Sequence, residues 1–132
     1  PLLDRIDLHV EVTPVPFSAL AAQKGGEDSA SIRQRVIKAR EIQGMRYSGY
    51  TGIYCNAQIS SKLLKEICSI DAAGQTLLKT AMDKLNLSAR AYDRILKVSR
   101  TIADLAGSDP VRTEHLAEAI QYRSLDREGW AG

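Results

Sequence analysis

Apolar and polar residues alternate strictly near the start of the chain. The apolar side carries Ile6, Leu8, Val10 and Val12, and the polar side carries Asp7, His9 and Glu11. A period of two predicts a half-buried β-strand over 6–12. Pro14 and Pro16 end this pattern because proline cannot donate a backbone hydrogen bond. A helical turn is expected over 18–23, and the stretch KGGEDS that follows is expected to be a flexible connector.

After the connector the apolar residues recur every three or four positions, which is typical of amphipathic helices. The first predicted helix runs from about Ser29 to Tyr47. Ser31 and Gln34 have the spacing of a capping box at its start. Its apolar positions are Ile32, Val36, Ala39 and Ile42.

Four more helical stretches follow a loop rich in glycine and tyrosine. The residues expected to cap or start them are, in order, Ser60, Asp71, Asn86 or Ser88, and Asp109 with Pro110. The third of them is the most regular, with an apolar stripe made by Ala91, Ile95, Val98, Ile102 and Leu105. Gly107 is a natural C-terminal stop for this helix.

These patterns predict an all-α fold, a bundle of four to five helices preceded by a poorly ordered extended N-terminal segment. The sequence offers no second strand to pair with the first, and an unpaired strand is unstable in water. We therefore expect the chain to be a fragment whose partner strands lie elsewhere. The predicted divisions are a tail over 1–27, a helical domain over 28–126 and a flexible C-terminus over 127–132.

The amino-acid composition limits the possible functions less than the pattern of apolar and polar positions does. The chain has 132 residues, 44% of them hydrophobic and 26% charged, with a net charge of +2. These values are typical of a globular domain and give no bulk electrostatic reason to bind nucleic acid. Two cysteines without metal-ligand spacing favour a reduced, cytoplasmic protein. No stretch has the length of apolar sequence that a membrane span needs.

Three cations lie along one predicted helix face. Arg90 falls in the first turn, where unsatisfied backbone amides already carry partial positive charge, and Arg94 and Lys97 follow at one-turn spacing. An anion such as phosphate would suit an arginine in this position. Alternatively, Asp93 and Asp104 neutralise these cations on a solvated face. Spacing alone favours this second interpretation.

Other residues leave two interpretations open. Arg5, between two aspartates, is either part of a local salt bridge or an arginine finger for phosphoryl transfer. The basic residues of the first helix and the tyrosines after it belong either to a solvated exterior and a bundle edge or to a DNA-binding surface. These residues are Arg33, Arg35, Lys38, Arg40, Arg46, Tyr47, Tyr50 and Tyr54. His9 and His115 are interpreted as structural or surface residues.

No phosphate-binding loop of the form GxxxxGK[ST] occurs in the sequence, and neither does a nucleophile constellation. The chain by itself is therefore not expected to be an enzyme.

Several runs are similar to a known family. PLLDRIDLHVEV, REIQ, GIYCNAQIS, LSARAYDRILKVSRTIADL and HLAEAIQYRSLDR together resemble the C-terminal part of the magnesium-chelatase-like AAA+ ATPases, the YifB and ComM group of bacteria. The resemblance implies a helical lid that follows a nucleotide-binding core, with residues 1–27 as the tail end of that core. Lid rotation would then couple the phosphate state to the arrangement of subunits.

The resemblance also implies roles for single residues. Arg5 matches the arginine finger, Arg90 matches the sensor-2 arginine, and Arg94 would join Arg90 at the phosphates of ATP. In the longer protein we expect ATP and Mg²⁺, a homohexameric ring and DNA as partner, with branch migration as the activity. The fragment alone is expected to bind ATP weakly or not detectably, and it is not expected to bind Mg²⁺. The alternative is a non-enzymatic module that binds DNA or docks other subunits.

Overall fold

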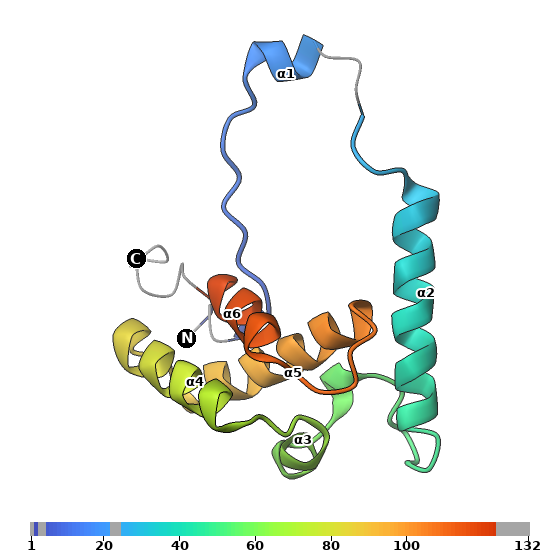
Figure 1. Ribbon diagram of the computed structural model, residues 1–132, viewed down its shortest axis with the longest axis vertical. Coiled ribbons are helices and arrows are strands. Elements are labelled where there is room, and N and C mark those ends of the chain that lie inside the picture. The colour runs from blue at the N-terminus through green and yellow to red at the C-terminus, as the bar shows by residue number, and fades with distance from the viewer. Residues whose placement is uncertain (1, 3–4, 22–24, 124–132) are drawn as a thin grey trace.

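The computed structural model describes residues 2, 5–21 and 25–123 (Figure 1). Over these residues the chain forms six α-helices and one 3-10 turn, without a strand, which confirms the all-α class. The elements are α1 (Phe17–Ala21), α2 (Ser29–Arg46), η2 (Asn56–Gln58), α3 (Ser61–Ile67), α4 (Ala72–Leu85), α5 (Ala89–Leu105) and α6 (Thr113–Gln121). The predicted C-terminus over 127–132 and the end of the predicted helical domain at 126 lie outside the described residues.

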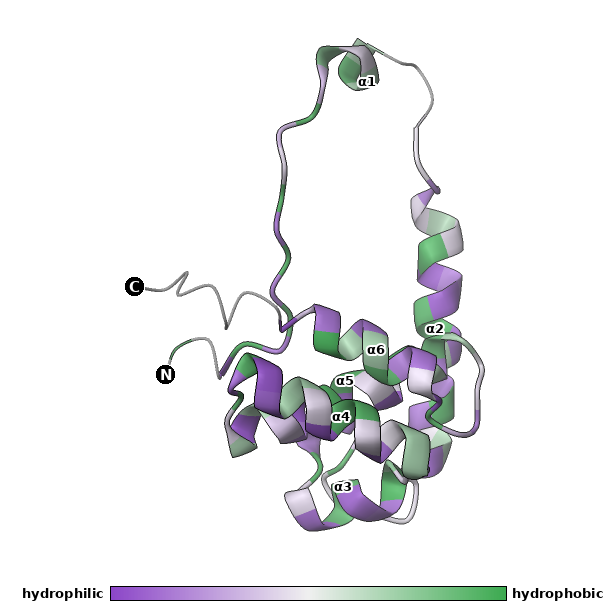
Figure 2. Ribbon diagram, turned by 60° about the vertical axis from the view of Figure 1, so that its left-hand side comes forward, coloured by the Kyte–Doolittle hydropathy of each residue, from purple (hydrophilic) through white to green (hydrophobic). Residues whose placement is uncertain are grey.

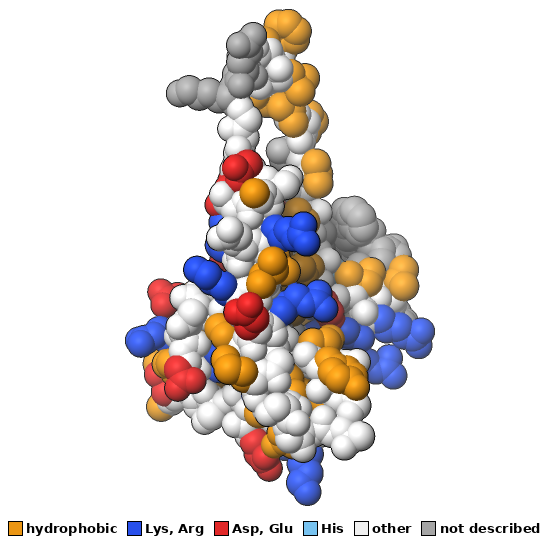
Figure 3. All heavy atoms as spheres, turned by 90° about the vertical axis from the view of Figure 1, so that its right-hand side faces the viewer, with side chains coloured by type: hydrophobic (Ala, Val, Ile, Leu, Met, Phe, Trp, Pro, Cys, Tyr) orange, Lys and Arg blue, Asp and Glu red, His pale blue; other side chains and the backbone are white. Residues whose placement is uncertain are grey.

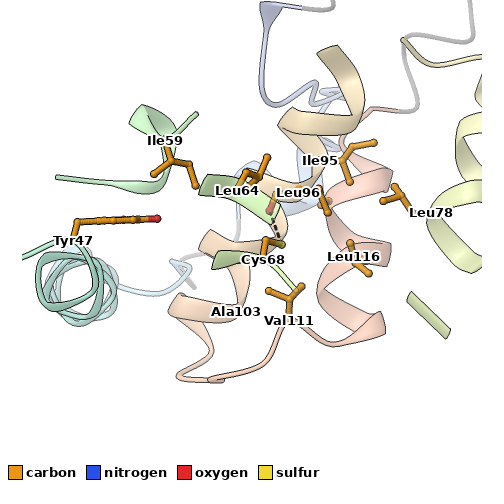
Figure 4. Close-up of a cluster of buried hydrophobic side chains, with 11 residues drawn as sticks. Tyr47, Ile59, Leu64, Cys68, Leu78, Ile95, Leu96, Ala103, Val111 and Leu116 are labelled. Atoms are coloured by element: carbon orange, nitrogen blue, oxygen red, sulfur yellow. Dashed lines mark hydrogen bonds between the residues drawn. The ribbon is translucent and has the colours of Figure 1, made fainter. Parts of the chain in front are cut away.

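Helix α5 is the centre of the body. It packs against α2, α3 and α6, and α6 also packs against α4. The side chains that fill the space between these helices include Tyr47, Ile59, Leu64, Cys68, Leu78, Ile95, Leu96, Ala103, Val111 and Leu116 (Figure 4). Each fully buried large apolar side chain contributes about 1.5–3 kcal/mol relative to an exposed one. A single core therefore joins elements that span residues 47–119.

Side-chain caps define where most helices begin. Ser60, Asp71 and Ser88 accept backbone hydrogen bonds from Leu63, Gly74 and Ala91, which confirms three predicted starts. The other candidate for α5, Asn86, instead ends α4 in a left-handed conformation with φ of 50°. The predicted capping box at Ser31 and Gln34 is wrong, because the carboxylate of Asp28 accepts from the Ser31 amide at 2.9 Å.

The start predicted for the last helix at Asp109 and Pro110 is also wrong. Helix α6 begins at Thr113, and His115 Nδ1 accepts a hydrogen bond from the Arg112 amide at 2.9 Å. The carbonyls of residues 108 and 109 accept hydrogen bonds from Arg100, which holds the preceding loop in an irregular path. His115 is buried, in agreement with a structural role.

The alternating segment 6–12 has no partner strand among the described residues, as the sequence predicts for this chain. These residues form no ladder with any described residue, and Val10 and Val12 are 64% and 85% exposed. His9, from the side predicted to face solvent, is buried, and its amide donates to the Tyr122 carbonyl at 2.9 Å. No described strand lies beside this extended segment, and its contact with Tyr122, at the end of α6, orients it instead. Beyond it, α1 lies away from the body (Figures 1 and 2).

Helix α2 also extends beyond the body. Only Ala39 and Gln43 are buried, while Ile32 and Val36 on the same predicted stripe are 44% and 41% exposed. The C-terminal half of the helix packs against α5, and the N-terminal half projects past it (Figures 1 and 2). Of the predicted apolar stripe, the body therefore buries Ala39 fully and Ile42 in part, and it leaves Ile32 and Val36 exposed.

Candidate functional site

The predicted cationic face of α5 is present. The Ser88 hydroxyl accepts from the Ala91 amide at 3.2 Å, which starts the helix and places Arg90 in its first turn. Ala91 is fully buried, so the start of α5 is fixed against the body while the side chain of Arg90 is exposed. Arg94 and Lys97 follow on the next two turns and are half-buried. The row of three cations thus starts at the N-terminal, electropositive end of α5.

The partners of these cations differ from the prediction. Asp93 accepts a hydrogen bond from the Ser61 hydroxyl, and Asp104 is 2% exposed and lies within a separate buried cluster. Among the described residues neither aspartate forms an ion pair with one of these three cations, although Asp93 keeps its charge beside Arg94. Within the part of the chain that the structure describes, Arg90 forms no side-chain hydrogen bond or ion pair.

Arg94 is paired with a residue that sequence reasoning missed. Its guanidinium donates to the carboxylate of Asp7, in the extended N-terminal segment. Lys97 Nζ donates to the carbonyl of Ala57 at 3.3 Å. A cleft of about 360 Å³ lies beside the pair, lined by Asp7, Leu8, Arg94, Lys97, Val98 and Tyr122 among others. The residues of this cleft come from both ends of the chain.

Two more contacts hold the N-terminal segment in place. Arg123 Nη1 donates to the carbonyl of Ile6, and the His9 amide donates to Tyr122. Arg5 is exposed and lies two residues before Asp7, so its Cα is at most about 7 Å from that of Asp7. The structure therefore brings the segment that carries Arg5 to the second turn of α5. Contacts across 87 residues of sequence, like that of Asp7 with Arg94, have no signal in a local pattern.

A second polar cluster is buried between α2, η2 and α5. Asp104 accepts from Arg46 at 2.6 and 2.9 Å, from Asn56 at 3.0 Å and from Arg100 at 3.2 Å. Burial alone would raise the pKa of the Asp104 carboxyl. The hydrogen bonds from Arg46 and Asn56 and the charges of the two arginines outweigh it, so this pKa lies below the ordinary value of 3.8. The ionised carboxylate therefore joins three elements.

This buried cluster removes several candidates for DNA contact. Tyr47 is 2% exposed, and its hydroxyl donates to Asn56 at 2.6 Å, so its ring is not free to stack on a base. Arg46 is held by Asp104. The exposed candidates that remain are Arg33, Arg35, Lys38, Arg40, Tyr50 and Tyr54, with Arg35 in an exposed ion pair with Glu27. On the α2 side of the molecule, basic side chains alternate with acidic and apolar ones (Figure 3).

The described residues contain no cluster of three or more histidine, cysteine, aspartate or glutamate side chains that could hold a metal ion. Among the helices of the same residues, none is both long enough and apolar enough to cross a membrane.

Comparisons with known proteins identify the family of the chain. Residues 26–123 match the family described as magnesium chelatase, subunit ChlI C-terminal, and the chain belongs to this family. It is 45% identical over 128 residues to competence protein ComM of Haemophilus influenzae and 39% identical over 129 residues to protein YifB of Escherichia coli. Each match covers 96% of this chain and 24% of the relative. The chain thus spans about a quarter of the length of these relatives.

Proposed function

We propose that the chain is the helical lid of an AAA+ ATPase, in which Arg90 senses the terminal phosphate of ATP. The position of Arg90 carries this proposal. Its exposed guanidinium stands in the first turn of α5, where the helix dipole disfavours a cation unless an anion is close. Family membership adds independent support.

The chain's own residues would bind phosphate oxygens. A guanidinium donates two parallel hydrogen bonds to a phosphate, and the backbone amides at a helix start favour the same ligand. In this proposal the nucleotide with its Mg²⁺ is held by residues of a longer protein outside this chain or by a neighbouring subunit. Arg90 approaches the terminal phosphate, Arg94 assists it, and Arg5 acts as the arginine finger.

The activity of the whole protein is part of the same proposal. We place the lid in a homohexameric ring that moves branched DNA in the cytoplasm, with its own AAA+ core and the neighbouring subunits as partners. The name of the H. influenzae relative, a competence protein, supports a role connected with competence.

The Arg90→Ala variant of the longer polypeptide tests the sensor role. Loss of one donor to a transferring phosphoryl group lowers turnover by about a hundredfold or more. We therefore expect steady-state ATP hydrolysis to fall by this factor, with the fold unchanged by circular dichroism. Lys79→Ala, which removes an exposed cation from α4, is the matched control and should leave hydrolysis unchanged. Unchanged turnover in Arg90→Ala would contradict the sensor role.

A non-enzymatic DNA-binding module is the second candidate, favoured by Arg33, Lys38 and Arg40 on the projecting helix α2. Binding through such residues releases counterions from DNA, so affinity should fall steeply with salt. Titration of this chain with branched DNA between 50 and 200 mM salt separates the candidates. The lid proposal expects no measurable binding by the chain alone. A steep salt dependence that is lost in the triple alanine variant of these residues would favour the DNA-binding module.

A further inference from the structure

We propose that Asp7 is a displaceable internal counter-ion, which occupies Arg94 until the phosphate of a nucleotide takes its place. The inference rests on the proposed function, because it concerns the control of the same phosphate site. Its physical basis is the contact between the Asp7 carboxylate and the Arg94 guanidinium. A carboxylate and a phosphate oxygen compete for the same donors of an arginine.

The carboxylate is delivered by a segment that is held through other atoms. Arg123 binds the carbonyl of Ile6, and the amide of His9 binds the carbonyl of Tyr122. Neither contact uses the side chain of Asp7. The segment can therefore stay in place when the carboxylate leaves Arg94. Tethering of this kind gives the carboxylate a high effective concentration at the arginine without a strong bond.

The pair itself is weak enough to exchange. The side chains of Arg94 and Asp7 are 31% and 53% exposed, and ion pairs in contact with water contribute about 0–1 kcal/mol. A polyphosphate carries several negative charges and would also meet Lys97, which lines the same cleft as the pair. The balance of charges therefore favours phosphate once it is present. Before that, Asp7 offsets one of the α5 cations.

The exchange has a consequence for Arg5. When phosphate binds Arg94, the segment that carries Arg5 loses the contact of the Asp7 carboxylate with α5 and keeps the contacts of the Ile6 carbonyl and the His9 amide with Arg123 and Tyr122. The ligand at the lid thus changes the constraint on the segment that carries the arginine finger. A permanent positioning role for Asp7 would act in the opposite sense, since its loss would then weaken phosphate binding or turnover.

Isothermal titration of this chain with inorganic tripolyphosphate measures the competition directly. Removal of a competing exposed ion pair is expected to tighten binding by about two- to fivefold in Asp7→Asn. Asp93→Asn is the matched control, because it removes the same charge beside Arg94 from a carboxylate that binds Ser61 instead. The affinity of Asp93→Asn for tripolyphosphate should change by less than half of the factor found for Asp7→Asn. In an Arg94→Gln background the gain from Asp7→Asn should disappear.

Three results would overturn the proposal: no gain in Asp7→Asn, an equal gain in Asp93→Asn, or a gain that persists without Arg94. Absence of tripolyphosphate binding in every variant would also overturn it. In the longer polypeptide, Asp7→Asn should lower the KM for ATP by the same factor. If the tripolyphosphate results hold while Arg90→Ala hydrolyses ATP normally, the sensor role fails and the competition at Arg94 stands.

Discussion

Replacement of Asp104 by alanine is expected to lower the free energy of unfolding by about 3–5 kcal/mol, the usual cost of removing one partner from a buried ion pair. The carboxylate is the common acceptor for Arg46, Arg100 and Asn56, and Arg100 is 4% exposed. Its loss removes the carboxylate that pairs with both arginines. Urea denaturation followed by circular dichroism measures the change.

Asp83→Ala is the matched control, because Asp83 is an exposed aspartate in α4 and its loss should change stability by less than about 0.5 kcal/mol. Acid titration separates the charge of Asp104 from its packing. Since the folded pKa lies below 3.8, the stabilisation by Asp104 is complete above that pH and is lost as the pH falls through the folded pKa. Asp104→Asn should therefore flatten the loss of stability below pH 4. An equal dependence of stability on pH below pH 4 in the unaltered protein and in Asp104→Asn would contradict the role given to the Asp104 charge.

The Arg5→Ala variant of the longer polypeptide is expected to hydrolyse ATP at least about a thousandfold more slowly than the parent, the usual effect of an arginine finger. Its affinity for ATP should change little, because a finger acts on the charge that develops in the transition state. Arg5 is exposed, so its loss should leave thermal stability unchanged. Turnover and nucleotide binding are measured on the same preparation.

Mixed assemblies show where the finger acts. Arg5→Ala subunits keep their own ATP site, and subunits with an inactivated phosphate-binding loop keep their Arg5. If the finger acts on a neighbouring subunit, mixing these two inactive proteins restores part of the hydrolysis. No recovery in verified mixed rings would place Arg5 in its own subunit's site or remove it from the mechanism.

Local sequence signals were sufficient for most helix starts. Ser60, Asp71 and Ser88 each supply an oxygen that accepts an amide hydrogen at the start of a helix, and this chemistry depends on residues within three positions. The start of α6 was not predictable in this way. Its position depends on Arg100, which holds the carbonyls of residues 108 and 109 from another helix.

The buried face of α5 shows a second limit. The apolar pattern places Leu105 on the core stripe, yet it is 44% exposed, while Ser99 and Asp104 are buried. Hydrogen bonds to Arg46 and Asn56 make burial of Asp104 favourable, and they come from distant parts of the chain. Periodicity ranks residues by hydropathy alone, so it cannot find a buried position that a polar partner satisfies.

The candidate site was predictable only in part. Arg90 and its place in the first turn of α5 follow from the cap at Ser88 and the spacing of the helix. The ion pair between Asp7 and Arg94 was not predictable, because it depends on how an extended segment crosses the end of α6. The strict alternation of the same segment predicts a strand, and no described strand lies beside it.

The relative affinity for ATP over ADP tests the lid assignment most directly. A lid arginine that contacts the terminal phosphate should favour ATP, so Arg90→Ala in the longer polypeptide should lower the ratio of ATP to ADP affinity by at least about tenfold, the loss of one or two charged hydrogen bonds. ADP affinity itself should stay nearly constant. If the ratio is unchanged in Arg90→Ala, this arginine does not contact the terminal phosphate, and the proposed role of the chain is wrong.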